Sequence, residues 1–169
     1  ADVISTIDLH YPRSHPSPLE PCGSIADFDR ATGKLTVYMT TQAPHIIRAA
    51  VALVAELPEH MIRIISPDLG GGFGNKVPIY PGYVLSIVGS IVAKRPVKWM
   101  EDRSENLMST GFARDYHMTT SIASTKEGKI LGVKVDVLAD HGAFNGTAQP
   151  TNYPAGFFHI FTGSYDYPA

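Results

Sequence analysis

The sequence has 169 residues, of which 44% are hydrophobic and 18% charged, and its formal net charge at neutral pH is -2. This composition is typical of a globular protein in the single-domain size range and excludes a fully disordered chain. It also argues against nucleic acid as the main partner, because proteins that bind nucleic acid present clustered positive charge. The single cysteine, Cys22, allows no internal disulfide and favours a reducing compartment.

The first part of the chain predicts a strand followed by an extended loop. Apolar residues alternate with polar ones over residues 2–12, and four prolines lie between residues 12 and 21. The loop also carries His15, Glu20 and Cys22, whose side chains are of types that bind metals. We interpret them as ordered loop residues, because three candidate ligands fall short of the usual four of a closed structural site.

A hairpin, a helix and a short strand come next. Residues 25–28 and 35–39 flank a connection that contains a glycine, which is typical of a hairpin. After Pro44, apolar residues recur at helical spacing over residues 45–57. Residues 61–65 then predict a short strand that leads directly into a glycine-rich segment.

The glycine-rich segment spans residues 67–76 and has four glycines around Phe73. Glycine allows unusual backbone angles and lets main-chain N–H groups approach a ligand closely. A dinucleotide fingerprint counted from Gly70 needs a sixth-position glycine, but Asn75 is there. A phosphate-binding P-loop needs Gly-Lys followed by Ser or Thr, and the sequence Gly-Asn-Lys-Val does not match. The sequence therefore predicts another kind of ligand loop, or else a tight turn.

The second half of the chain contains a further helix and three more strands. Residues 83–93 predict the helix, residues 97–100 a strand, and residues 116–124 and 130–138 the clearest hairpin. We interpret the charged residues 101–105 as a solvated loop or helix start.

Together these elements predict an α+β fold, with mixed sheet strands, two main helices and a glycine-rich cofactor loop. Beyond Ala139 the sequence is rich in glycine, aromatics and proline, which indicates irregular structure that lines a partner or a site. Its polar residues are Asp140, His141, Asn145, Gln149 and His159. Because the chain starts within a strand pattern and stops without a closing element, we expect a fragment truncated at both ends.

No residue of the sequence is identified as a catalytic acid, base, nucleophile or metal ligand. Cys22 has no suitably spaced partner, and the seven histidines are scattered along the chain. The acidic pairs Asp27 with Asp29 and Glu101 with Asp102 lie in settings that look exposed.

Six blocks of sequence follow one another in an order that is more specific than any single block. They are residues 15–20, 41–45, 64–76, 97–103, 112–117 and 139–142. Together they resemble the molybdenum hydroxylases of the xanthine dehydrogenase and aldehyde oxidase family, and within it the large subunits of aerobic carbon monoxide dehydrogenases. The resemblance covers nearly the whole chain. It implies that residues 1–169 form part of the first molybdenum- and molybdopterin-binding domain of a larger subunit.

The resemblance also implies roles for particular residues. Gln42 falls where the family places a glutamine that hydrogen-bonds an oxo ligand of molybdenum, for which an amide NH₂ is a suitable donor. Gly71, Gly72, Phe73 and Gly74 fall in the loop that contacts the molybdopterin.

One position departs from the purine hydroxylases of the family. Val77 replaces the glutamate that binds substrate in those enzymes, which suits a small uncharged substrate better than a purine. The resemblance also implies a copper-binding cysteine, carried by the carbon monoxide enzymes on a later loop, and a catalytic glutamate near the C-terminus of the family's subunits; both positions lie outside this sequence.

For the parent enzyme, the resemblance implies oxidation of carbon monoxide with water to carbon dioxide. The implied cofactors are molybdopterin in its cytosine dinucleotide form, molybdenum and copper, with FAD and [2Fe-2S] clusters on partner subunits. The implied partners are a flavin-binding medium subunit and an iron–sulfur small subunit, arranged as a dimer of heterotrimers. The expected location is the cytoplasm, at the inner face of the membrane.

Two alternatives stay open at this point. One is an aldehyde or heterocycle hydroxylase of the same family. The other is a structural or subunit-contact fragment that binds no cofactor and has no activity of its own.

Overall fold

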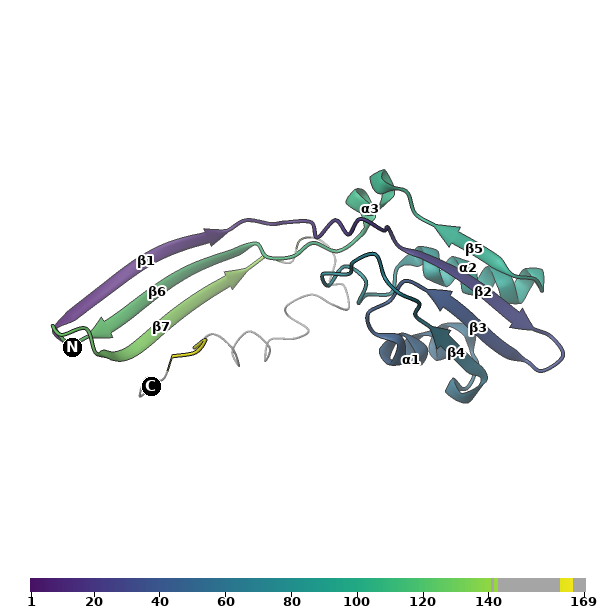
Figure 1. Cartoon of the computed structure of the whole chain (residues 1–169), viewed down its shortest axis with the longest axis horizontal. Helices are drawn as coiled ribbons and strands as arrows, with labels where there is room; N and C mark the ends of the chain where they lie inside the picture. Colours follow the sequence, from purple (N-terminus) through teal and green to yellow (C-terminus); the bar gives the residue numbers. More distant parts are fainter. Residues whose placement is uncertain (141, 143–161, 166–169) are drawn as a thin grey trace. The chain divides into compact units, whose positions relative to one another are not determined.

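The computed structural model describes residues 1–140, 142 and 162–165. They form two compact units, drawn in Figure 1. Unit 1 combines residues 1–14 with the chain from residue 113 onward, and unit 2 comprises residues 15–112. The length of the chain falls in the single-domain range, whereas the structure divides it into these two units.

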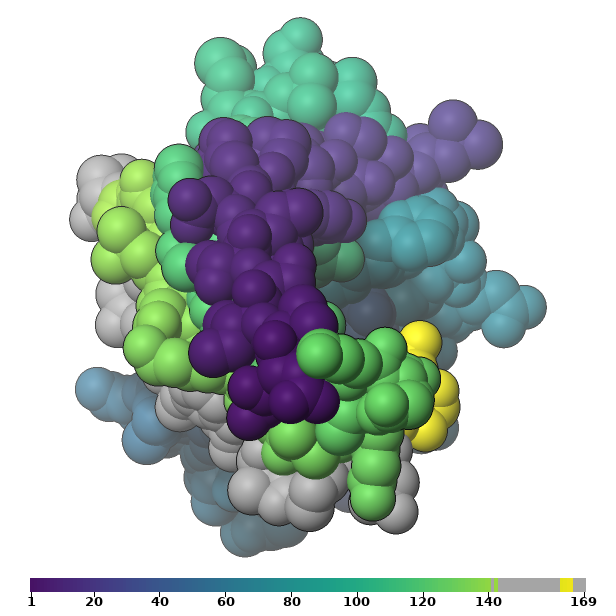
Figure 2. All heavy atoms as spheres, turned by 90° about the vertical axis from the view of Figure 1, so that its left-hand side faces the viewer, coloured from purple at the N-terminus to yellow at the C-terminus, as the bar shows by residue number. Residues whose placement is uncertain are grey.

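Unit 1 contains a three-stranded antiparallel sheet in the order β1-β6-β7. Its strands are β1 (Val3–Tyr11), β6 (Tyr116–Ser124) and β7 (Ile130–Ala139). The register places His10 opposite His117 on the neighbouring strand. Figure 2 shows this sheet in space-filling form, with β1 in purple beside the green of β6 and β7. The predicted first strand and second hairpin are both confirmed.

The two faces of this sheet differ in chemistry, because successive side chains of a strand point to opposite faces. One face is mainly apolar and includes Val3, Ile7, Leu9, Tyr11, Met118, Ile122, Val133, Val135 and Val137. The other face is mainly polar and includes Thr6, Asp8, His10, His117, Thr119, Ser121, Lys134 and Asp136.

Unit 2 contains a four-stranded mixed sheet in the order β4-β3-β2-β5. Its strands are β2 (Gly23–Asp29), β3 (Lys34–Met39), β4 (Ile62–Ile65) and β5 (Val97–Met100). The β2–β3 hairpin is antiparallel, β5 pairs antiparallel with β2, and β4 pairs parallel with β3. The parallel pair results from the helix that connects β3 to β4, as in any crossover connection.

Helices pack against this sheet and bury its core. The longer ones are α1 (Pro44–Ala55) and α2 (Pro81–Ala93), each with proline in its first turn, and η1 (Glu59–Met61) is a short 3₁₀ turn. α1 packs against β4, and α2 packs against β2 and β5. The fully buried apolar side chains lie between these layers and include Leu35, Val37, Ile47, Val51, Tyr83 and Ile87.

A third helix, α3 (Arg103–Ser109), starts within the charged segment. Asp102 accepts a hydrogen bond from the Glu105 N–H while the Glu105 side chain accepts one from the Asp102 N–H, which is a capping box. The predicted helix start is therefore confirmed. The predicted exposure of the acidic pair is wrong for Glu101, which is only 5% exposed because its carboxylate is bonded inside the unit.

The calls made beyond residue 140 fall mostly outside the described residues. This applies to His141, Asn145, Gln149 and His159. Within the residues that the structure describes, no helix is long and apolar enough to cross a membrane.

Candidate cofactor-binding site

The glycine-rich loop connects β4 to α2 and is held in left-handed backbone conformations. The φ angles are +91° at Gly71, +52° at Phe73 and +86° at Gly74. A positive φ is unusual for a bulky aromatic residue and costs about 1–3 kcal/mol, which the surrounding contacts have to offset. The Phe73 ring is largely exposed. The backbone thus turns sharply and presents one rigid apolar face outward.

Gln42, in the turn between β3 and α1, fixes the far end of this loop. Its side-chain oxygen, Oε1, accepts hydrogen bonds from the N–H groups of Gly74 at 3.0 Å and Lys76 at 3.2 Å. Because a main-chain N–H can only donate, these two contacts establish which side-chain atom is the oxygen. The amide NH₂ has no acceptor among the described residues. It therefore remains available as a donor at the exposed side of the loop.

Position 72 has to be glycine because the Gln42 side chain lies too close for any Cβ there. A Cβ added at Gly72 would lie 2.4 Å from the side-chain Cδ of Gln42, which is far inside van der Waals contact. The loop backbone and this amide side chain therefore fit together only without a side chain at this position.

Glu20 and Lys76 clamp the two ends of the loop. The Lys76 side chain is fully buried, and its Nζ donates to Glu20 Oε2 at 2.6 Å. The same oxygen accepts from the Gly70 N–H at 2.9 Å. Burial acts to raise the pKa of Glu20, but the bonds from Lys76 and Gly70 outweigh it and lower that pKa. One carboxylate thus joins residues from both ends of the loop.

Asn75 connects the loop to the interior of unit 2. Its Nδ2 donates to Thr110 Oγ1 at 2.9 Å and to the Gly111 carbonyl at 3.3 Å, and its carbonyl accepts from the Tyr80 hydroxyl at 2.6 Å. Burial raises the pKa of Tyr80, so the hydroxyl keeps its proton and remains a donor. Asn75 is therefore held through both its side chain and its main-chain carbonyl.

Glu101 and Cys22 extend this buried network. Glu101 Oε1 accepts from the Cys22 N–H at 2.6 Å and from the side-chain amide of Asn106, while Oε2 has no partner in the described part of the chain. Burial, as the largest cause, raises the pKa of the Cys22 thiol to about 12. Cys22 is therefore a protonated core residue at neutral pH.

The early loop residues do not form a metal site. His15 Nδ1 pairs with the Ser17 hydroxyl at 2.8 Å and its Nε2 with the Thr110 hydroxyl at 2.8 Å. Glu20 binds Lys76, and Cys22 lies in the core. These separate contacts agree with the interpretation of the three as ordered loop residues.

The structure brings together the residues singled out from the sequence: Gln42 contacts Gly74 directly and lies against Gly72. Sequence reasoning missed the supporting residues Asn75, Glu101 and Asn106. The adjacent Asn-Lys dipeptide at the end of the loop was the only local signal, because the side-chain partners of Asn75 and Lys76 lie at least 31 residues away in the sequence.

The loop has the chemistry expected for an anionic, oxygen-rich ligand. The N–H groups of Gly71, Gly72 and Phe73 have no acceptor among the residues described, and a Cβ at Gly74 would meet nothing within 4 Å. Successive main-chain N–H groups without internal acceptors are the kind of donors that bind anions. The Gln42 NH₂ adds a side-chain donor, so the residues present fit such a cofactor.

Comparison with known proteins gives consistent matches over the whole chain. The sequence model of the molybdopterin cofactor-binding domain matches residues 1–169. The carbon monoxide dehydrogenase large chain of Hydrogenophaga pseudoflava is 59% identical over 168 residues, which are 99% of this chain and 21% of that protein. The nicotine 6-hydroxylase large subunit of Paenarthrobacter nicotinovorans is 35% identical, over 99% of this chain and 21% of that protein.

A solved structure shows the same likeness. The crystal structure of the Cu,Mo-CO dehydrogenase in its carbon monoxide reduced state matches with a TM-score of 0.89 and 58% identity, over 99% of this chain and 21% of that one. The chain thus spans about a fifth of the length of these relatives.

Proposed function

The chain belongs to the family of molybdopterin cofactor-binding domains, and we propose on this premise that it supplies one wall of the molybdenum site in a larger subunit. In this proposal residues 1–169 are part of the first molybdenum-binding domain of that subunit. The whole enzyme is an oxidoreductase of the carbon monoxide dehydrogenase type, supported by 59% identity to one such large chain. The molybdenum cofactor, when bound, supplies the two-electron redox chemistry.

The residues of this chain bind and orient the cofactor. Gln42 donates its free NH₂ to an oxygen atom of the cofactor, and the N–H groups of Gly71, Gly72 and Phe73 donate to its anionic groups. Glu20 and Lys76 hold the loop in the shape that aims these donors. The observation that carries the proposal is the Gln42 amide, whose oxygen is occupied by two main-chain donors while its NH₂ stays free.

Two substitutions at Gln42 test this role in the complete enzyme. Gln42→Glu keeps an oxygen acceptor for Gly74 and Lys76 but removes the NH₂ donor, whereas Gln42→Ala removes both functions. We expect both variants to lower turnover by about 100-fold, the typical effect of losing one positioned donor. Molybdenum content and the unfolding transition should stay near wild type in Gln42→Glu. Full activity of that variant at normal molybdenum content would refute the role.

Carbon monoxide is the proposed substrate, and copper distinguishes it from the alternatives. A relative that is 58% identical is described as a Cu,Mo enzyme, and the apolar Val77 suits a small uncharged substrate. The likeness to a nicotine 6-hydroxylase subunit keeps a heterocycle or aldehyde hydroxylase as the second candidate. Molybdenum and copper in near-equal amounts in the native protein would support carbon monoxide oxidation. Molybdenum without copper would favour the hydroxylase.

The proposal extends to partners that carry the remaining redox groups. A flavin subunit with FAD and an iron–sulfur subunit with [2Fe-2S] clusters would pass electrons onward in a cytoplasmic dimer of heterotrimers. Native mass spectrometry of the complex tests this composition, and a large subunit purified without either partner would contradict it.

The remaining alternative is a structural fragment without cofactor. Hydrogen exchange of residues 68–77 with and without molybdopterin decides this point. Added protection supports binding, and unchanged exchange would overturn it for this chain.

A further inference from the structure

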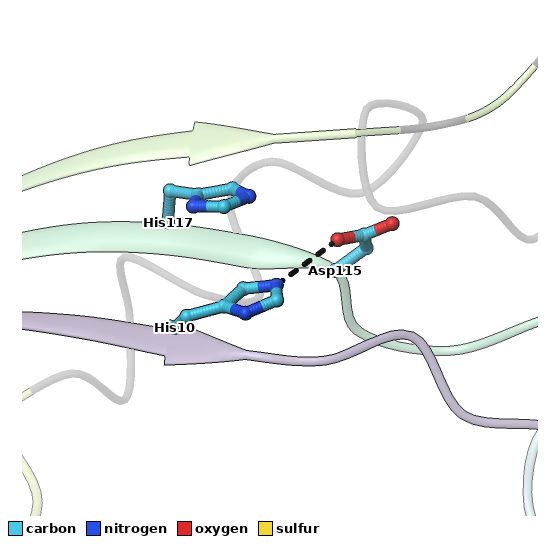
Figure 3. Close-up of side chains that lie close together, drawn as sticks. All are labelled: His10, Asp115 and His117. Carbon is cyan, nitrogen blue, oxygen red and sulfur yellow. Dashed lines mark ion pairs between the residues drawn. The ribbon is translucent and has the colours of Figure 1, made fainter.

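A cluster of metal-binding side chains lies in unit 1, on the polar face of its sheet. The β1–β6 register places His10 opposite His117, and Asp115 immediately precedes β6. Figure 3 shows the two imidazole rings facing each other, with the Asp115 carboxylate beside His10. One potential ligand atom from each residue lies within 4.8 Å of the others. No residue of the glycine-rich loop takes part.

We propose that His10, Asp115 and His117 bind a divalent first-row transition metal ion, with Zn²⁺ as the representative case. Two imidazoles and one carboxylate form a ligand set that suits Zn²⁺, Co²⁺ or Ni²⁺ better than Mg²⁺ or Ca²⁺, which prefer oxygen ligands. Water completes the coordination, since three protein ligands leave at least one position open.

Arg13 orients the Asp115 carboxylate so that one of its oxygens faces the histidines. The Arg13 Nε donates to Asp115 Oδ2 at 2.9 Å, which leaves Oδ1 turned toward His10 Nε2 at 3.5 Å. A bond to the outer oxygen of a carboxylate is a common way to orient a metal ligand. Arg13 also contacts Asp140 Oδ1 at 3.3 Å, so part of its positive charge is compensated.

The backbone at Asp115 is unusual. Arg114 and Asp115 have φ angles of +76° and +67°, although neither is glycine. Consecutive residues in this sparsely populated region are strained, and such strain concentrates at binding sites. The turn aims the Asp115 side chain along the sheet toward the histidines.

The two rings have room to converge on one ion. They are stacked with centroids 4.2 Å apart and planes 11° from parallel, so one ring has to turn before both nitrogen lone pairs meet. The side chain of His10 is 52% exposed, and rotation about its Cβ–Cγ bond is therefore unhindered by a packed core. Asp8 lines the same surface pocket and adds negative charge that favours a cation. Asp136 lines it too, but its charge is largely compensated by Lys134, whose Nζ lies 2.8 Å from Asp136 Oδ2.

Zinc titration of the complete protein in its native assembly tests the site. The probe is Zn²⁺ alone, bound zinc is counted per chain by elemental analysis after removal of the excess, and X-ray absorption identifies the ligands. The variants are His10→Ala, His117→Ala and Asp115→Asn, the last chosen because asparagine tolerates a left-handed backbone. His60→Ala, which removes an exposed histidine of unit 2, is the matched control.

We expect wild type and His60→Ala to bind one more zinc ion per chain than the cluster variants. Affinity in those variants should fall by at least about ten-fold, the lower end of the effect of altering even a supporting group. The absorption spectrum should show two imidazoles and an oxygen ligand. Equal zinc uptake by wild type and His10→Ala, or equal loss in His60→Ala, would overturn the proposal.

Discussion

At the scale of single residues, the candidate site depends on glycines that leave room for neighbouring side chains as well as on the side chains themselves. Gly72 lies against the Gln42 side chain, and the missing Cβ is what allows this contact. Gly89, in the middle of α2, is different, because an added Cβ there would meet Val97 atoms at ordinary distances of 3.5 Å and more. Substituting each of these two glycines with alanine therefore gives a test and its control.

Gly72→Ala should displace Gln42 and loosen the loop. We expect the free energy of unfolding to fall by about 1–3 kcal/mol, as for other overpacked positions, and turnover of the complete enzyme to fall by at least ten-fold. Gly89→Ala should be neutral or stabilise the protein by up to about 1 kcal/mol, because alanine favours helix. Chemical denaturation and steady-state rates provide the measurement. A harmless Gly72→Ala would show that the loop does not rest on Gln42.

Cys22 should resist alkylation while the protein is folded. With a thiol pKa of about 12, only about one part in ten thousand is thiolate at pH 8, and the thiolate is the reactive form. The raised pKa also means that its contribution to stability is complete below the unfolded pKa of about 8.5 and declines as the pH rises above it. Peptide mapping after iodoacetamide treatment checks this. Equal labelling of folded and denatured protein would contradict it.

At the scale of elements, one carboxylate joins the loop before β2 to the loop between β4 and α2. Glu20 bonds both Gly70 and the buried Lys76, so its removal would leave a buried ammonium group without its partner. The Arg48–Glu59 ion pair offers a contrast, since both of its side chains are at least 40% exposed. Loss of the Glu20 contacts should therefore lower the stability of unit 2, whereas loss of the Arg48–Glu59 ion pair should not.

Glu20→Gln should therefore destabilise unit 2 by roughly 2 kcal/mol, within the range for hydrogen bonds to charged groups, whereas Glu59→Gln should change stability by less than about 1 kcal/mol. Because the folded pKa of Glu20 is lowered, its contribution is present above its ordinary pKa of 4.5 and is lost as the pH falls through the lower folded value. Denaturation of wild type and both variants at neutral and acidic pH measures this. A Glu20→Gln protein whose deficit persists unchanged in acid would contradict the charge-based explanation.

At the scale of the whole molecule, unit 1 presents a broad apolar sheet face. Ile7 and Leu9 on this face are 55% and 44% exposed, while Ile4 on the opposite face is 71% exposed. Contiguous apolar surface of this kind is uncommon on a free monomer. The chain spans about a fifth of the length of the relatives it matches. In the larger subunit proposed above, the rest of that subunit would cover this apolar face.

The chain expressed alone should therefore bind an apolar dye such as anilinonaphthalene sulfonate. The double variant Ile7→Lys with Leu9→Lys should reduce the fluorescence several-fold, because it places two charges on the apolar face. Ile4→Lys, on the polar face, should leave the fluorescence close to that of wild type. Equal effects of the two changes would show that the dye does not distinguish the faces.

Local patterns predicted the elements well but not the contacts between distant ones. Helical spacing and strand alternation are short-range signals, so α1, α2 and the two hairpins were predictable. The parallel pairing of β4 with β3 and the approach of His10 to His117 depend on register between segments far apart in the chain. Glu101 was misjudged for the same reason, because Cys22, whose N–H it bonds, lies 79 residues earlier in the chain.

The pinned amide of Gln42 has a consequence for ligand polarity. To reverse its side chain, the protein would have to break two main-chain hydrogen bonds and place an NH₂ group against two N–H donors. The position therefore cannot adapt to the ligand as a free glutamine does. Its NH₂ can only donate a hydrogen bond, so ligand atoms with lone pairs bind there. Cations and hydrogen-bond donors of similar size are disfavoured at this position by polarity alone.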